Sequence, residues 1–188
     1  MRKNFYLFLL ILLSGCGYKI SSSQPSIAIS HVEKDYDGML AATLAKQLTD
    51  KGITYNNNSN LKLIVKIIER TTNDIGYMHD KEENGQPKQN ILACEGREKI
   101  VTEISLKNEK EGKIIIGPLK ISAYSDFDFI QQDAKQELVF TDIHNQQQET
   151  LPFSLGQLEA KESAEHAAQR PLYQKLAKNI IDVITSYL

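Results

Sequence analysis

The fold is decided by the stretch Ile100-Val101-Thr102-Glu103-Ile104-Ser105-Leu106-Lys107. Its even-numbered side chains are apolar except Thr102, and its odd-numbered side chains are polar except Val101. Successive side chains of a strand point to opposite faces. The alternation therefore predicts a long strand over residues 91–107 that buries one of its faces.

A similar strand is predicted immediately before this one. Residues 61–69 place Leu63, Val65 and Ile67 on one face. The connecting residues 71–89 are polar and contain glycine and proline, so we expect a long hairpin loop there.

A third strand of the same series is predicted at residues 113–129, bent or interrupted at Gly117-Pro118. It follows a turn at residues 108–112. Three consecutive strands joined by turns favour an antiparallel meander. A first, shorter strand is predicted at residues 27–32 from its partial alternation.

Two amphipathic helices complete the expected fold. The first has Asp37 as a plausible N-cap and Gly52 where a C-terminal glycine is expected. Its apolar residues recur at three- and four-residue spacing: Met39, Leu40, Leu44 and Leu48.

The second helix is predicted at the C-terminus, where Pro171 either starts it or kinks a longer helix that begins near Ser163. Its apolar stripe contains Leu172, Leu176, Ile180, Val183 or Ile184, and Tyr187. Residues 131–161 are expected to be an irregular excursion with some helix. The predicted fold is α+β in the order β-α-β-β-β-α, with an antiparallel four-stranded sheet and both helices on one face.

The N-terminus carries a secretory signal. Arg2 and Lys3 precede a nearly continuous apolar run that is too short to span a bilayer. The run ends in Leu13-Ser14-Gly15-Cys16, which resembles a bacterial lipobox. That resemblance implies a diacylglyceryl group on the Cys16 thiol and cleavage before Cys16. The alternative is an ordinary signal that happens to contain a cysteine.

Three segments follow from this division of the chain. Residues 1–15 are expected to be a lipoprotein signal peptide, and residues 16–26 a lipidated N-terminus and tether. Residues 27–188 are expected to form a single domain.

Composition excludes several functions. The net charge of −2 across 188 residues gives no basic excess for nucleic-acid binding. Cys94 is the only cysteine besides Cys16, so no internal disulfide is expected. We favour a buried, inert Cys94 thiol, with a catalytic or intermolecular thiol as the alternative. The sequence has no metal-ligand spacing, nucleophile elbow or phosphate loop, so we expect no metal, no cofactor and no enzyme activity.

Basic residues on the predicted strands are the candidate ligand-binding set. Strands gather distant residues on one sheet, and charge-assisted contacts to phosphate are strong. An ordinary soluble surface is the alternative for each residue. The candidates are Lys62, Lys66, Arg70, Arg97 and Lys99.

Aromatic and acidic residues near residue 125 admit two interpretations. For Tyr124, Phe127 and Phe129 we favour the core, and a lipid- or partner-facing edge is the alternative. Asp126 and Asp128 could mimic a catalytic carboxylate pair, but we favour solvated charges near a strand end.

The chain resembles the LPS-assembly lipoprotein family, LptE. The likeness covers most of the mature chain in order, although residues 131–161 are longer than in compact members and residues 71–89 are hard to place. The matching segments are Cys16-Gly17-Tyr18, residues 27–32, Leu48-Thr49-Asp50-Lys51-Gly52-Ile53, residues 61–70, Ile121-Ser122-Ala123-Tyr124-Ser125-Asp126-Phe127 and residues 163–184.

The resemblance implies a transport function at the periplasmic face of the outer membrane. The protein would be the partner or plug of an LptD-type β-barrel and would help deliver lipopolysaccharide (LPS) to the outer leaflet. Gly17 after the lipidated cysteine is compatible with outer-membrane sorting. The alternative is an accessory lipoprotein of another envelope machine, either a secretin pilot or a cell-wall synthase activator. A periplasmic enzyme is the weakest hypothesis.

Overall fold

The computed structural model describes residues 25–82, 86–130, 139–149 and 160–188. The signal peptide, Cys16 and most of the tether lie outside the described residues. The elements in chain order are β1 (Ser26–Ile29), α2 (Met39–Asp50), β2 (Thr54–Tyr55), β3 (Leu61–Lys81), β4 (Pro87–Asn108), β5 (Lys113–Asp128), β6 (Val139–Thr141), β7 (Gln147–Glu149) and α3 (Lys161–Thr185).

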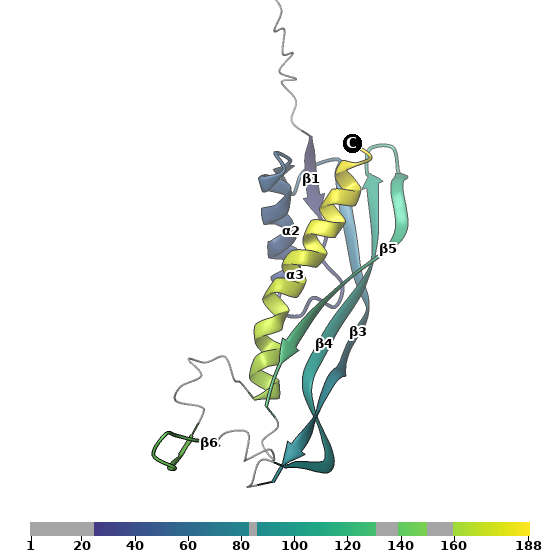
Figure 1. Ribbon diagram of the computed structural model, residues 1–188. Helices are drawn as coiled ribbons and strands as arrows, with labels where there is room; N and C mark the ends of the chain where they lie inside the picture. Colours follow the sequence, from purple (N-terminus) through teal and green to yellow (C-terminus); the bar gives the residue numbers. More distant parts are fainter. Residues whose placement is uncertain (1–24, 83–85, 131–138, 150–159) are drawn as a thin grey trace, which may run out of the picture.

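The main sheet has five strands in the order β2-β1-β3-β4-β5, and both helices cover one of its faces (Figure 1). This confirms the α+β class and the element order. β3, β4 and β5 form the predicted antiparallel meander. The sheet is mixed, however, because β1 runs parallel to β3 and to the short β2. In the chain, α2 connects β1 to the strands that pair with it. A helical connection of this kind brings the chain back so that the next strand runs parallel to the first.

The predicted loop at residues 71–89 is mostly paired strand, which corrects the sequence prediction. β3 continues to Lys81, and β4 begins at Pro87. The ladder tolerates polar side chains because its hydrogen bonds come from the backbone. Register shifts occur on either side of Gly76, and such bulges absorb irregular sequence. The polar composition of this segment therefore reflects exposure rather than an absence of strand.

Acidic side chains begin α2. Asp35 accepts hydrogen bonds from the backbone N–H groups of Leu40 at 3.3 Å and Ala41 at 2.9 Å. Asp37 accepts one from Met39 at 3.0 Å. The N-cap residue is Gly38 and not Asp37, so the prediction was wrong by one residue. Three otherwise unpaired donors of the first turn are satisfied by these two carboxylates.

Gly52 ends α2 as the sequence predicts. Its φ of 75° is in the left-handed region, which glycine adopts without the Cβ penalty of other residues. The Gly52 N–H donates to Thr49 and the Ile53 N–H donates to Leu48, each at 2.9 Å. These two bonds form a Schellman motif, which turns the chain into β2.

The helix α3 is a single element that includes Pro171. The longer of the two predicted helices is therefore present. Pro171 has no N–H to donate to the carbonyl four residues earlier, yet the helix continues because its apolar stripe is buried. Of the excursion at residues 131–161, the structure describes the small β6–β7 hairpin, together with Ala160 and Lys161 at the start of α3.

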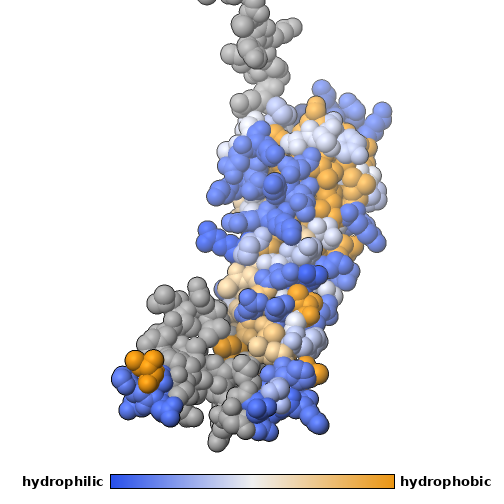
Figure 2. All heavy atoms as spheres, in the orientation of Figure 1, coloured by the Kyte–Doolittle hydropathy of each residue, from blue (hydrophilic) through white to orange (hydrophobic). Residues whose placement is uncertain are grey.

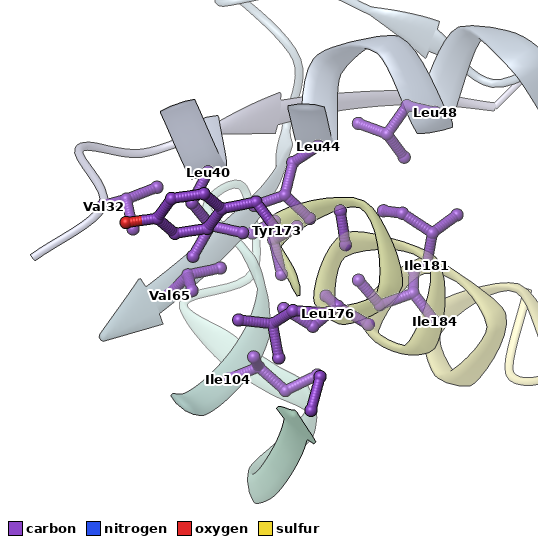
Figure 3. Close-up of a cluster of buried hydrophobic side chains, with 14 of the residues drawn as sticks. Val32, Leu40, Leu44, Leu48, Val65, Ile104, Tyr173, Leu176, Ile181 and Ile184 are labelled. Carbon is purple, nitrogen blue, oxygen red and sulfur yellow. The ribbon is translucent and has the colours of Figure 1, made fainter. Parts of the chain in front are cut away.

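Two apolar clusters hold the layers together. The larger joins the helices to the sheet, and in Figure 3 the Tyr173 ring lies among Val32, Leu40 and Val65. A smaller cluster near the start of α3 contains Ala93, Phe127, Phe129, Ala164 and Ala168. Phe127 and Phe129 are thus core residues, with ring centroids 6.0 Å apart. A side chain at Gly96 would overlap the Phe127 ring.

The outer edge of the sheet is β5, and parts of α3 cover it. Lys175 Nζ donates to the Tyr124 carbonyl at 3.4 Å. Asn179 Nδ2 donates to the Ser122 carbonyl at 3.3 Å. Pro118, in the same strand, has no N–H to offer a further strand. The β5 edge therefore lacks a regular row of free backbone N–H and C=O groups with which another strand could pair.

We expect Leu44→Ala to lower the free energy of unfolding by about 2–5 kcal/mol, because the fully buried side chain would leave a cavity. Urea unfolding followed by circular dichroism measures the loss. The control is Ile64→Ala, whose side chain is 41% exposed and should cost no more than about 1 kcal/mol. Equal losses for both variants would contradict this description of the core.

Candidate functional site

Four of the five candidate basic residues lie on the face of the sheet that the helices do not cover. Lys62 and Lys66 flank buried Leu63 and Val65 on β3, and Arg97 and Lys99 flank buried Glu98 on β4. Because directly paired residues share a face, Lys62 lies beside Lys107 and Lys99 beside Tyr124.

These residues do not converge on one point. Lys107, the partner of Lys62, is ten residues from Arg97 along β4, which is about 33 Å. Carboxylates also partner three of the set: Glu109 lies 3.7 Å from Lys62, Glu33 lies 2.9 Å from Lys66, and Asp126 lies 2.6 Å from Arg97. The uncovered face is therefore a mixed-charge surface rather than a concentrated phosphate site.

Arg70 lies on the opposite, helix-facing side. A register shift between Ile67 and Glu69 reverses the alternation of β3, so Arg70 does not join Lys62 and Lys66. Its Nε donates to Glu98 Oε1 at 2.6 Å, and its Nη1 donates to the Tyr173 hydroxyl at 3.4 Å.

Glu98 is a buried carboxylate beneath α3. It has no exposed surface, and in the described part of the chain its Oε2 has no hydrogen-bond partner. Burial raises the pKa of Glu98, and the Arg70 guanidinium opposes this rise without cancelling it. Arg70 is thus explained as the counterion of a buried acid.

Tyr124 is the exposed member of the aromatic group. Arg97 Cζ lies 4.3 Å from the centre of its ring, and Lys175 Nζ lies 4.1 Å from it. Two hydrogen bonds, of 2.6 and 2.8 Å, tie Arg97 to Asp126 and lower the pKa of that carboxyl. Asp126 is therefore a solvated ion-pair partner. Tyr124 is not a core residue, so the core interpretation was wrong for it.

A groove of about 760 Å³ between α2 and α3 brings several cationic side chains together. Four cationic side chains line it, and no carboxylate lines it: Lys46, Arg170, Lys175 and Lys178. Apolar groups of Met39, Ala42 and Pro171 also line it. We name this feature the interhelix groove. Figure 2 shows hydrophilic side chains over α2, on one side of the groove.

Sequence analysis missed the interhelix groove. Each helix alone has an ordinary polar stripe beside its buried stripe, and a polar stripe usually means solvent. The usable signal was the spacing of Arg170, Lys175 and Lys178 along one face of α3, together with Lys46 on the other helix. These residues line one groove only because α2 and α3 pack side by side.

The described residues offer neither a spanning helix nor a metal cluster. Across residues 25–82, 86–130, 139–149 and 160–188, no helix is long and apolar enough to cross a membrane. Within the same ranges, no three His, Cys, Asp or Glu side chains gather as a metal site. Cys94, on β4, is half-buried and is not part of a disulfide.

Solved structures with the same fold include bacterial lipoproteins. A minor lipoprotein from Acinetobacter baumannii is 15% identical, with a TM-score of 0.50, and the match covers 87% of this chain and 92% of that one. The rare lipoprotein B from Shewanella oneidensis is 13% identical, with a TM-score of 0.44 over 86% and 94% of the chains. No family model and no curated protein sequence matches. The fold is thus similar to that of a solved bacterial lipoprotein.

We expect Glu98→Gln to remove an acid-range pH dependence of stability. The native state holds the Glu98 proton above the ordinary pKa of 4.5, while the unfolded chain loses it there. The Glu98 contribution is therefore complete below pH 4.5 and is lost as the pH rises through the native pKa. Urea unfolding at a series of pH values should show Glu98→Gln gaining stability relative to the parent as the pH rises.

A second variant tests the cause of this pKa. Arg70→Gln removes the charge that opposes the rise, so stability should fall more steeply with pH than in the parent. Parallel pH profiles for the parent and Glu98→Gln would show that the carboxyl is not perturbed in this way.

Proposed function

We propose that this protein is an outer-membrane lipoprotein that assists LPS transport and assembly as the partner or plug of an LptD-type β-barrel. One coincidence carries the proposal. The lipobox-like Leu13-Ser14-Gly15-Cys16 precedes a domain whose fold is shared with a bacterial lipoprotein. The lipobox-like motif comes from the sequence and the lipoprotein-like fold from the structure. Because the two observations are independent, finding both favours a role in the cell envelope.

The order of matching segments adds support. The LptE-like segments correspond to successive elements of the structure: β1, the C-terminal end of α2, β3, β5 and α3. The capped end at Gly52 and the long final helix are both part of this set. A sequence likeness spread over every layer of the fold is more specific than any one of its short motifs.

The surface suits a binding role more than catalysis. On the sheet, cations alternate with carboxylates around Tyr124, and on the helical side cations gather in the interhelix groove. Such surfaces offer charge-assisted hydrogen bonds to phosphates and carboxylates without a nucleophile or base. In the proposed role, the protein holds and positions its partners.

Depletion of the protein tests the function. We expect surface LPS to fall and LPS precursors to accumulate in the periplasm, because delivery to the outer leaflet would fail. Labelling of surface LPS and fractionation of the envelope measure both. Re-expression of the parent chain should restore the parent distribution. Unchanged surface LPS after depletion would refute the proposal.

Cross-linking in cells, followed by purification, separates this function from its main competitor. The proposal requires an LptD-type barrel among the recovered partners. Recovery of a secretin or a cell-wall synthase in its place would identify the protein as an accessory factor of that machine instead.

Substitution of Cys16 tests the anchor. Cys16→Ser cannot receive a thioether-linked lipid, so we expect the protein to leave the membrane fraction. Cys94→Ser is the matched control and should remain in the membrane. A Cys16→Ser protein that fractionates like the parent would contradict lipidation at this residue.

A further inference from the structure

The interhelix groove carries positive charge that the side chains lining it do not neutralise. The whole chain has a net charge of −2, yet the groove has four cations and no carboxylate in its lining. In the described part of the chain, no direct ion pair involves Lys46, Arg170 or Lys178, although Asp182, which pairs with Lys51, also interacts electrostatically with Lys178. The fourth cation, Lys175, is directed to the Tyr124 ring and carbonyl.

The register of the helices places two of these cations together. Lys51, just after α2, forms an ion pair with Asp182 of α3 at 2.8 Å. Lys46 precedes Lys51 by five residues and Lys178 precedes Asp182 by four, so both lie at the same level of the helix pair. Arg170 lies eight residues before Lys178, about 12 Å away along α3. The groove thus has a doubly cationic end and an arginine end.

The lining indicates the chemistry of the occupant. Paired ammonium groups and a guanidinium favour phosphate oxygens, which Arg can bind through two parallel hydrogen bonds. Met39, Ala42 and Pro171 add apolar surface toward the arginine end. The Thr43 hydroxyl is already used, since it donates to the Met39 carbonyl at 2.7 Å. An amphiphile with a phosphate headgroup fits this lining better than free phosphate does.

The position of the groove favours a lipid of the membrane that would hold the anchor. The helix α2 lies at the same end of the molecule as β1 (Figure 1). β1 begins at Ser26, ten residues after Cys16, and ten extended residues span at most about 35 Å. An anchor at Cys16, which is part of the proposed function, keeps this end within reach of the leaflet surface.

We propose that the interhelix groove binds the phosphate headgroup of an anionic glycerophospholipid. The contact supplements the lipid anchor, whose diacylglyceryl group already supplies two acyl chains, by holding the groove against the leaflet. Bound in this way, the end of the domain that holds β1 and α2 faces the leaflet, and the end where β3 finishes at Lys81 and β4 begins at Pro87 lies away from it.

Calorimetric titration of the purified, lipidated protein in neutral detergent tests the groove directly. The probe is dihexanoyl phosphatidylglycerol, compared with dihexanoyl phosphatidylcholine. We expect phosphatidylglycerol to bind and phosphatidylcholine to bind at least about tenfold more weakly, because the net negative charge of the headgroup drives binding. Equal affinity for the two lipids would overturn the proposal.

Matched variants assign the binding to the groove. The triple variant Lys46→Gln, Arg170→Gln, Lys178→Gln should weaken phosphatidylglycerol binding at least about tenfold. The control Lys107→Gln, Lys110→Gln, Lys113→Gln removes the same charge at the β4–β5 turn and should change affinity less than about twofold. Thermal melts check that each variant is folded, and the charge-retaining Lys46→Arg, Lys178→Arg variant should bind like the parent. Equal losses in the triple variant and the control would refute a specific site.

The last experiment compares other ligands that could bind in the interhelix groove. Glycerol phosphate, a phosphorylated glycolipid of the lipid A type and a polyglutamate peptide are titrated in the same way. Tighter binding of any of these than of phosphatidylglycerol would overturn the glycerophospholipid assignment. The assay uses neither a barrel nor cellular LPS transport, so its failure would leave the depletion result standing, and a failed depletion test would leave this result standing.

Discussion

Burial of one face of β4 against α3 is the constraint on which the other elements depend. Ile100, Ile104 and Leu106 are almost completely buried, and Leu172, Leu176 and Ile180 of α3 meet the same cluster. β4 is the middle strand of the meander, so fixing its buried face also fixes which faces of β3 and β5 point inward. The position of α2 follows, because its leucine stripe has to join the apolar surface that α3 leaves open.

The sequence was most informative where alternation and burial coincide. The even positions from Ile100 to Leu106 predicted both the strand and its inward face. Direction and register were harder to predict. The parallel pairing of β1 depends on where α2 crosses, and the side of Arg70 depends on one register shift after Ile67. Neither the parallel pairing nor the register shift leaves a local sequence pattern. A bulge, for example, moves side chains to the other face without changing the amino-acid composition.

The candidate sites show the same limit. Residues on one strand can be assigned to a face from parity, which separates Lys62 and Lys66 from the buried Leu63 and Val65. The interhelix groove needs two distant segments in register, and the ion pair of Lys51 with Asp182 is what reveals that register. The buried Glu98 could not be recognised from sequence either, because its parity matched the core while its chemistry suggested solvent. Lipidation of Cys16 stays a prediction.

The covered edge of β5 has a consequence for many copies held on one surface. Proteins confined to two dimensions meet far more often than the same number in solution, and an open strand edge would let each encounter extend one sheet into the next. Here Lys175 and Asn179 occupy two outward carbonyls, and Pro118 removes a donor from the row. In the proposed lipid-anchored state, the β5 edges of neighbouring copies would therefore not join into one continuous sheet.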